Sequence, residues 1–143
     1  MPRAAALMCP SVDLSFTLGE VAGPEDAASE RLRERYTAPY LAGHPIDDPV
    51  VSPLSADLSG LPPTLIQAAT GDALLTHAHR LSEHLRTCGV DAQLELYPTA
   101  THGFQFFWSF LPEAGDAIER VARFCAADAP ASASRTRATG GGP

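Results

Sequence analysis

Two residues of the sequence have the types that proton transfer requires. Asp72 closes the stretch TLIQAATGD, and His102 follows the stretch ELYPTAT thirty positions later. A carboxylate that accepts the Nδ1–H of a histidine fixes the tautomer of the ring and stabilises the imidazolium that forms when Nε2 takes a proton. If the fold brings Asp72 and His102 together, they supply two thirds of a catalytic triad.

Each of these residues also has a simpler interpretation. Asp72 is suited to the start of the helix that follows it, because its carboxylate can accept a backbone N–H there. His102 alone is typical of an ordinary loop histidine. Only the joint placement of the two residues favours catalysis, so both alternatives stay open at this point.

The hydrophobic periodicity predicts the elements that position the pair. Residues 4–9 are a short continuous apolar run, typical of a strand buried on both faces, and a second apolar run predicts a strand over 64–69. Apolar residues recur every three or four positions over residues 74–88, which predicts an amphipathic helix with Gly89 as its left-handed C-terminal residue. Polar and apolar residues alternate over 91–97, which predicts a strand with one solvated face.

The order strand, helix, strand predicts a βαβ unit in a parallel sheet with a right-handed crossover. Ligands of such sheets bind at the carboxyl ends of the strands, where loops lead into helices. Asp72 follows the first of the two strands and His102 the second. We therefore expect both side chains at one rim of the sheet.

Three further segments complete the expected domain, which covers residues 1–127. A helix is predicted over 24–40, beginning with Pro24, and an irregular connection over 42–63, which holds five prolines and two glycines. A last helix should start at Leu111, with a buried stripe formed by Leu111, Ala114, Ile118, Val121 and Cys125. Residues 128–143 lack large apolar side chains and should form a disordered tail.

The composition excludes several classes of function. The chain has 143 residues, a formal net charge of -7 and ten basic residues, all arginine and scattered, so a nucleic-acid partner is not expected. No apolar run is long enough for a membrane span. The apolar stretch near Met1 is too short for a signal peptide, from which we infer a cytoplasmic protein.

Neither metal nor cofactor is expected from the remaining candidate ligands. The three cysteines, Cys9, Cys88 and Cys125, are widely spaced and suggest small buried residues. His77 and His79 lie two apart on a predicted helix and diverge, and no cysteine or carboxylate completes a site. The histidines other than His102 are interpreted as solvated surface residues; they are His44, His77, His79 and His84.

Five aromatic residues occur in the seven positions from Phe104 to Phe110. The simplest interpretation is that most of them form core around the last helix. A functional interpretation makes one or two of them the wall of an apolar pocket beside His102.

As a set, these stretches resemble the C-terminal half of the α/β-hydrolase fold, in the branch of hormone-sensitive lipase and related bacterial esterases. The resemblance rests on DDPVVSPLSADLSGLPPTLIQAATGDALLTHAHRLSEHLRTCGVDAQLELYPTATHGFQFF and, less sharply, on LMCPSVDLS and LPEAGDAIERVARF. It implies that Asp72 is the triad acid, that His102 is the general base and that the substrate is a small carboxylic ester.

The nucleophile of that family is missing from this chain. Its serine lies in a G-x-S-x-G turn preceded by an HGG-type oxyanion loop, and neither motif occurs here. Ser11, Ser15, Ser52 and Ser55 lack the strand, turn and helix setting of such a serine. We therefore expect the chain alone to be inactive and to need a complementing N-terminal segment, or to form a homo-oligomer. The alternative is an inactive fragment or a partner-dependent binding module.

Overall fold

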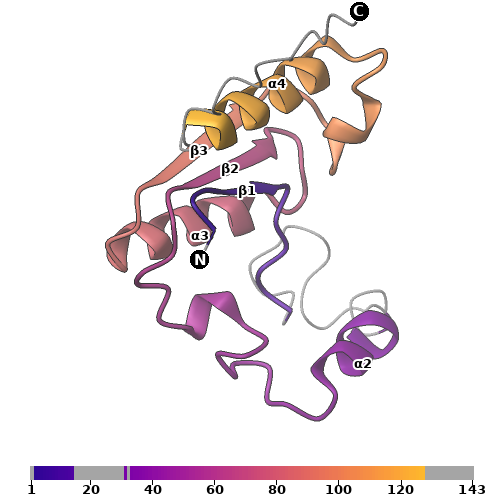
Figure 1. The fold of residues 1–143 in the computed structure, drawn as a ribbon. Helices are drawn as coiled ribbons and strands as arrows, with labels where there is room; N and C mark the ends of the chain where they lie inside the picture. Colours follow the sequence, from indigo (N-terminus) through magenta and orange to yellow (C-terminus); the bar gives the residue numbers. More distant parts are fainter. Residues whose placement is uncertain (1, 15–30, 32, 128–143) are drawn as a thin grey trace, which may run out of the picture.

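The computed structural model describes residues 2–14, 31 and 33–127, and within them a three-stranded sheet in the order β1-β2-β3. The strands are β1 (Ala5–Met8), β2 (Thr64–Ala69) and β3 (Ala92–Tyr97). Both strand pairs are parallel. Helices flank the two faces of the sheet (Figure 1), which confirms the α/β fold predicted from the sequence.

Helix α3 (Leu75–Thr87) covers one face of the sheet and follows the predicted periodicity. Its buried side chains include Leu81 and Leu85, which pack in one cluster with Ile66 of β2. Just beyond the helix lies Gly89, whose φ is 79°, and the amide of the next residue, Val90, donates to the Leu85 carbonyl at 3.0 Å. A left-handed glycine with this hydrogen bond is a Schellman ending, as the sequence indicated.

Helix α4 (Pro112–Ala127) covers the other face, but the predicted stripe is only partly right. Its buried residues are Ala114, Ala117 and Phe124, whereas Ile118 is 39% exposed and Cys125 is also exposed. The two alanines let the helix approach the sheet closely, since the carbonyl of Ala117 lies 3.0 Å from a side-chain amide of β2. The helix therefore packs against the sheet through Ala117, whose carbonyl accepts from Gln67, and Ile118 of the predicted stripe is left exposed.

The polar face of β3 is not solvated as predicted. Gln93 and Glu95 are half-buried, because Arg120 of α4 reaches across them. Arg120 donates from Nε to Glu95 Oε1 at 2.6 Å and from Nη2 to Gln93 Oε1 at 2.9 Å. The alternation of β3 is therefore real, but its polar side faces a helix.

Strands β1 and β2 share the predicted apolar character to different degrees. Every residue of β2 is buried, whereas β1 is half-buried and Met8 is 48% exposed. The difference follows from position, because β2 lies between two strands and β1 lies at an edge of the described sheet.

Segments outside the sheet are described only in part. Most of the predicted helix over 24–40 lies outside the described residues; its end holds a π-helical turn (Arg33–Thr37) and α2 (Ala38–Leu41). The connection over 42–63 is irregular apart from a single 3₁₀ turn, η2 (Pro53–Ser55), as expected. The predicted tail over 128–143 also lies outside the described residues. None of the helices in the described part is long and apolar enough to cross a membrane.

Candidate active site

The loops after β2 and β3 are tied together by their backbones. Thr70 donates its amide to the Tyr97 carbonyl at 2.8 Å, and Gly71 donates to the Thr99 carbonyl at 2.9 Å. The approach is so close that a Cβ atom at Gly71 would lie 2.8 Å from the Cα of Ala100. Only glycine fits this crossing, which brings the two predicted site residues within reach of each other.

Asp72 and His102 form the predicted pair. His102 Nδ1 lies 2.9 Å from Asp72 Oδ2, the geometry of an Nδ1–H that donates to a carboxylate. The Asp72 side chain is 1% exposed and that of His102 is 53% exposed. The carboxylate is thus sealed in the protein whereas the imidazole stays accessible, an arrangement that would suit general-base chemistry.

The interpretation of Asp72 as the N-cap of its helix is wrong, because Leu74 occupies that position without a side-chain cap, but Asp72 orders the turn just before the helix. Its second carboxylate oxygen, Oδ1, accepts the amide of Leu74 at 2.8 Å, at the position where α3 begins. One oxygen therefore orders the start of the helix and the other holds His102. The helix contact fixes the carboxylate in the orientation that the histidine uses.

Cys9 lies behind the pair, which the sequence analysis missed. The Cys9 Sγ, a carboxylate oxygen of Asp72 and a ring nitrogen of His102 all lie within 4.8 Å of one another. Burial raises the pKa of the Cys9 thiol, and the Asp72 carboxylate raises it further. The predicted burial of Cys9 is right, at 6% exposed, whereas Cys88 is only half-buried and Cys125 is exposed.

These three side chains are the donors in the described part of the chain that could hold a metal ion. Thiolate, imidazole and carboxylate together suit a soft divalent ion such as Zn²⁺. Binding would require the buried thiol to ionise and His102 to exchange its hydrogen bond with Asp72 for a metal bond. The existing contact between His102 and Asp72 therefore fits acid–base chemistry better than metal binding.

The interpretation of the other histidines as surface residues is wrong for His77. Its side chain is fully buried, and its Nδ1 accepts the amides of Val12 at 3.1 Å and Asp13 at 3.3 Å. Burial lowers the pKa of His77, so the ring is held neutral with Nδ1 as acceptor. His84 is half-buried against the Ala56 carbonyl; the exposed histidines are His44 and His79.

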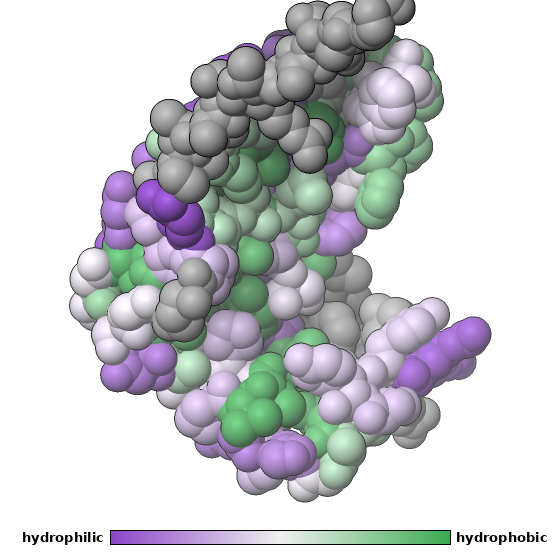
Figure 2. Space-filling model, viewed as in Figure 1, coloured by the Kyte–Doolittle hydropathy of each residue, from purple (hydrophilic) through white to green (hydrophobic). Residues whose placement is uncertain are grey.

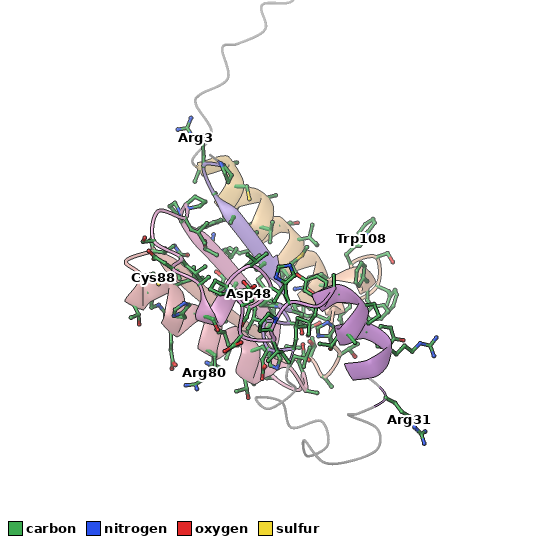
Figure 3. All side chains as sticks on the ribbon, turned by 90° about the horizontal axis from the view of Figure 1, so that it is seen from below. Arg3, Arg31, Asp48, Arg80, Cys88 and Trp108 are labelled. Atoms are coloured by element: carbon green, nitrogen blue, oxygen red, sulfur yellow. The ribbon has the colours of Figure 1, made fainter. Side chains whose placement is uncertain are left out.

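The aromatic run is mostly exposed, which corrects the expectation of core packing. Phe104 is fully buried, but Phe106 is 88% exposed, Trp108 66% and Phe110 75%. Figure 3 shows Trp108 extending outward, away from the sheet. The reason is the tight 3₁₀ turn η3 (Phe104–Phe107), which turns one aromatic ring inward and leaves its neighbours outside.

Two cavities of the described surface lie apart from Asp72 and His102. A cavity of about 460 Å³ lies between α3 and residues 46–55, and another of about 400 Å³ lies between α2 and residues 11–14. Neither cavity is lined by Asp72 or His102. Figure 2 shows the molecule hollowed between the part that holds α4 and η3 and the part that holds α2.

A parallel sheet between helices, with an acid and a base after neighbouring strands, is the arrangement of α/β proteins that bind ligands at strand ends. Comparison with known proteins gives the family. A family model described as alpha/beta hydrolase fold matches residues 1–106, so the chain belongs to that family. Its relatives place it among the esterases and lipases similar to hormone-sensitive lipase.

Three relatives show the extent of the match. An esterase of Acinetobacter venetianus is 32% identical over 132 residues, which are 87% of this chain and 42% of the relative. An acetyl-hydrolase of Streptomyces hygroscopicus is 34% identical over 100 residues, 70% of this chain and 32% of the relative. The crystal structure of an esterase from the bacterial hormone-sensitive lipase family matches at a TM-score of 0.76 and 35% identity, over 90% of this chain and 44% of that one. The chain spans less than half the length of these relatives.

Proposed function

We propose that this chain supplies the acid and the base of a serine-dependent carboxylic-ester hydrolase, with Asp72 as the acid and His102 as the base. The observation that carries the proposal is the 2.9 Å contact from His102 Nδ1 to the buried Asp72 carboxylate. The names of the relatives, an esterase and an acetyl-hydrolase, support a carboxylic ester as the substrate class.

On this proposal, each of the two residues has a defined role in the hydrolysis reaction. Asp72 holds the proton on Nδ1, which leaves Nε2 with the lone pair that takes the proton of a serine hydroxyl. The serine oxygen attacks the ester carbonyl, and the imidazolium, stabilised by the Asp72 carboxylate, returns the proton to the departing alcohol. Water then repeats the sequence on the acyl-serine, with His102 again as the base.

On this proposal the serine comes from a segment outside these 143 residues. The sequence holds no G-x-S-x-G turn, and without a nucleophile and oxyanion donors a histidine with its aspartate contributes about 10²- to 10⁴-fold at most. The exposed aromatic residues in and just after η3, which include Phe106 and Phe110, would then form part of an apolar wall for the substrate.

The test is ester hydrolysis by the natural gene product that contains this chain. Wild type should hydrolyse a short-chain nitrophenyl ester, and His102→Ala should lower kcat by about 10⁴-fold or more. Asp72→Asn should lower it to a similar degree, while His79→Ala, an exposed histidine on α3, should leave it unchanged. Full turnover in the His102→Ala protein would overturn the proposal.

A second candidate is a partner-dependent module without catalysis. The observation that favours it is the outer edge of β1, which has no paired strand among the described residues. An apolar strand with an open edge invites pairing with another chain. A natural product of 143 residues that binds a partner and hydrolyses no ester above buffer would favour this candidate; turnover that depends on His102 would exclude it.

A further inference from the structure

A chain of buried polar side chains runs behind the Asp72 and His102 pair, on the α4 side of the sheet. It links Cys9 at the end of β1, Gln67 in the middle of β2 and Gln105 in η3. These side chains are 6%, 0% and 5% exposed. Buried amides need partners, so the contacts among them report a built arrangement.

The hydrogen bonds among these buried side chains are all donated in one direction, from Cys9 toward Ala117. The Cys9 thiol donates to Gln105 Oε1 at 3.6 Å, and Gln105 Nε2 donates to Gln67 Oε1 at 3.4 Å. Gln67 Nε2 then donates to the Ala117 carbonyl at 3.0 Å and to the Tyr97 hydroxyl at 3.2 Å. Each amide uses both its oxygen and its nitrogen, so neither can flip without losing its partners.

The position of Gln105 couples this chain of contacts to the base. The turn η3 begins two residues after His102, with Gly103 between them as its N-cap, and its buried residues are Phe104 and Gln105. The burial of Phe104 holds the turn against the sheet but is not directional. The hydrogen bonds of Gln105 are directional, so they set the rotation of the turn that carries His102.

Cys9 has an unusual backbone conformation, which places its thiol close to Asp72 and His102. Its φ is 49°, a left-handed conformation that costs a non-glycine residue conformational energy. In this conformation Sγ lies within 4.8 Å of an Asp72 carboxylate oxygen and a His102 ring nitrogen. The strained residue therefore places a protonated thiol between Gln105 and the acid.

We propose that Gln105 and Cys9 are positioning residues, which hold the turn of His102 so that Nδ1 stays directed at Asp72. The proposal deepens the proposed function, because it concerns the geometry of the same pair. The contact from Gln105 Nε2 to Gln67 Oε1, at 3.4 Å, is longer than the usual N–H···O hydrogen bond, whereas 3.6 Å is ordinary for a thiol donor, so we expect each contact to have a modest effect.

The test reads the tautomer of His102 and does not require turnover. Imidazole ¹⁵N shifts of the neutral ring, measured by NMR, give the ratio of the Nδ1–H to the Nε2–H form. Wild type should hold the Nδ1–H form as the major one. Gln105→Leu should lower the ratio by about threefold to tenfold, the factor that one net hydrogen bond is worth.

Three further variants separate positioning from folding. Cys9→Ser keeps a donor and should stay near the wild-type ratio, whereas Cys9→Ala should lower it. Gln105→Asn keeps an amide that is too short to reach both partners, and serves if Gln105→Leu fails to fold. Gln93→Leu is the matched control, because Gln93 accepts from Arg120 on the same sheet face, away from His102; its ratio should equal wild type.

Three results would overturn the proposal: a folded Gln105→Leu with the wild-type ratio, an equal shift in Gln93→Leu, or a wild-type ring that is mainly Nε2–H. If the variants show the expected tautomer shifts but the wild-type protein hydrolyses no ester, only the proposed function is refuted.

Discussion

The two faces of the sheet are built in different ways. On the α3 face, Ile66, Leu81 and Leu85 form a continuous apolar core. On the α4 face, a hydrogen-bonded set of side chains centres on Gln67, beside a smaller cluster around Phe104. Asp72 and His102 lie at the rim where the two faces meet the strand ends.

This difference assigns different tasks to the two faces. A buried leucine contributes about 1.5–3 kcal/mol through removal of its surface from water, without fixing direction. A buried hydrogen bond contributes about 0.5–1.5 kcal/mol net but fixes direction closely. On our proposal, the α3 face contributes mainly apolar burial, whereas the hydrogen bonds of the α4 face orient the His102 ring.

The largest effect on stability is expected in the α3 core. Leu85 is 1% exposed, so Leu85→Ala should lower the free energy of unfolding by about 2–5 kcal/mol through lost burial and a cavity. Urea unfolding measures it. The matched control is Leu96→Ala, at a residue 42% exposed, which should cost less than about 1 kcal/mol. Equal costs at the two sites would contradict the assignment of the core.

A smaller effect is expected where the two site loops cross. In Gly71→Ala the new Cβ meets the backbone of Ala100 at 2.8 Å, which cannot yield as a side chain would, so about 3 kcal/mol is lost and His102 moves from Asp72. Thermal unfolding and the His102 tautomer report both. Gly115→Ala, whose Cβ meets the Trp108 carbonyl at 3.9 Å within α4, should stabilise by up to about 1 kcal/mol. A Gly71→Ala protein with wild-type thermal stability and a wild-type His102 tautomer ratio would contradict the close contact between the two loops.

The next effect depends on pH and on His77. Its pKa is lowered by burial, so below the unfolded value of 6.5 the unfolded state binds more protons and the free energy of unfolding falls. Protonation removes Nδ1 as an acceptor for two amides, a loss of about 1–2 kcal/mol. The carboxylates of Asp13 and Asp72 oppose this shift, and His102 adds to it.

Unfolding midpoints at a series of pH values measure the effect. His77→Gln retains an acceptor and should flatten the decline below pH 6.5, while His79→Gln should keep the wild-type decline. An unchanged decline in His77→Gln would assign the titration to another group.

The smallest effect is expected at the ion pairs of α4. Arg120→Met should cost about 0.5–1 kcal/mol, because Arg120 and Glu95 are 31% and 29% exposed and are linked at 2.6 Å. Arg123→Met, which removes the exposed pair with Glu119, should cost close to nothing. The difference between the two variants should shrink in high salt. Equal costs would show that the contact to β3 contributes no more than a surface pair.

The sequence predicted those parts of the fold that depend on local pattern. The period of α3, its ending at Gly89 and the parallel order of β2 and β3 all follow from side-chain spacing. The joint position of Asp72 and His102 followed from the rule that parallel strands end at one rim. These features need no knowledge of distant contacts.

The errors arose where a distant contact decided the outcome. His77 has a polar type, but two amides of the segment after β1 satisfy it in the core. Gln67 is a polar residue within an apolar strand, and its side-chain amide donates to the Ala117 carbonyl. In this packing Ala117 is buried against the sheet, whereas Ile118 is exposed. In the aromatic run, the 3₁₀ turn and not hydrophobicity determines which ring is buried.

We propose that the proton accepted by His102 comes from a serine outside these 143 residues. Labelling of the natural gene product with a fluorophosphonate, followed by mapping of the labelled peptide, tests it most directly. We expect the label on a single serine, in a G-x-S-x-G turn of the gene product outside residues 1–143. We also expect His102→Ala to lose the labelling. A label on a serine within residues 1–143, or full labelling without His102, would contradict it.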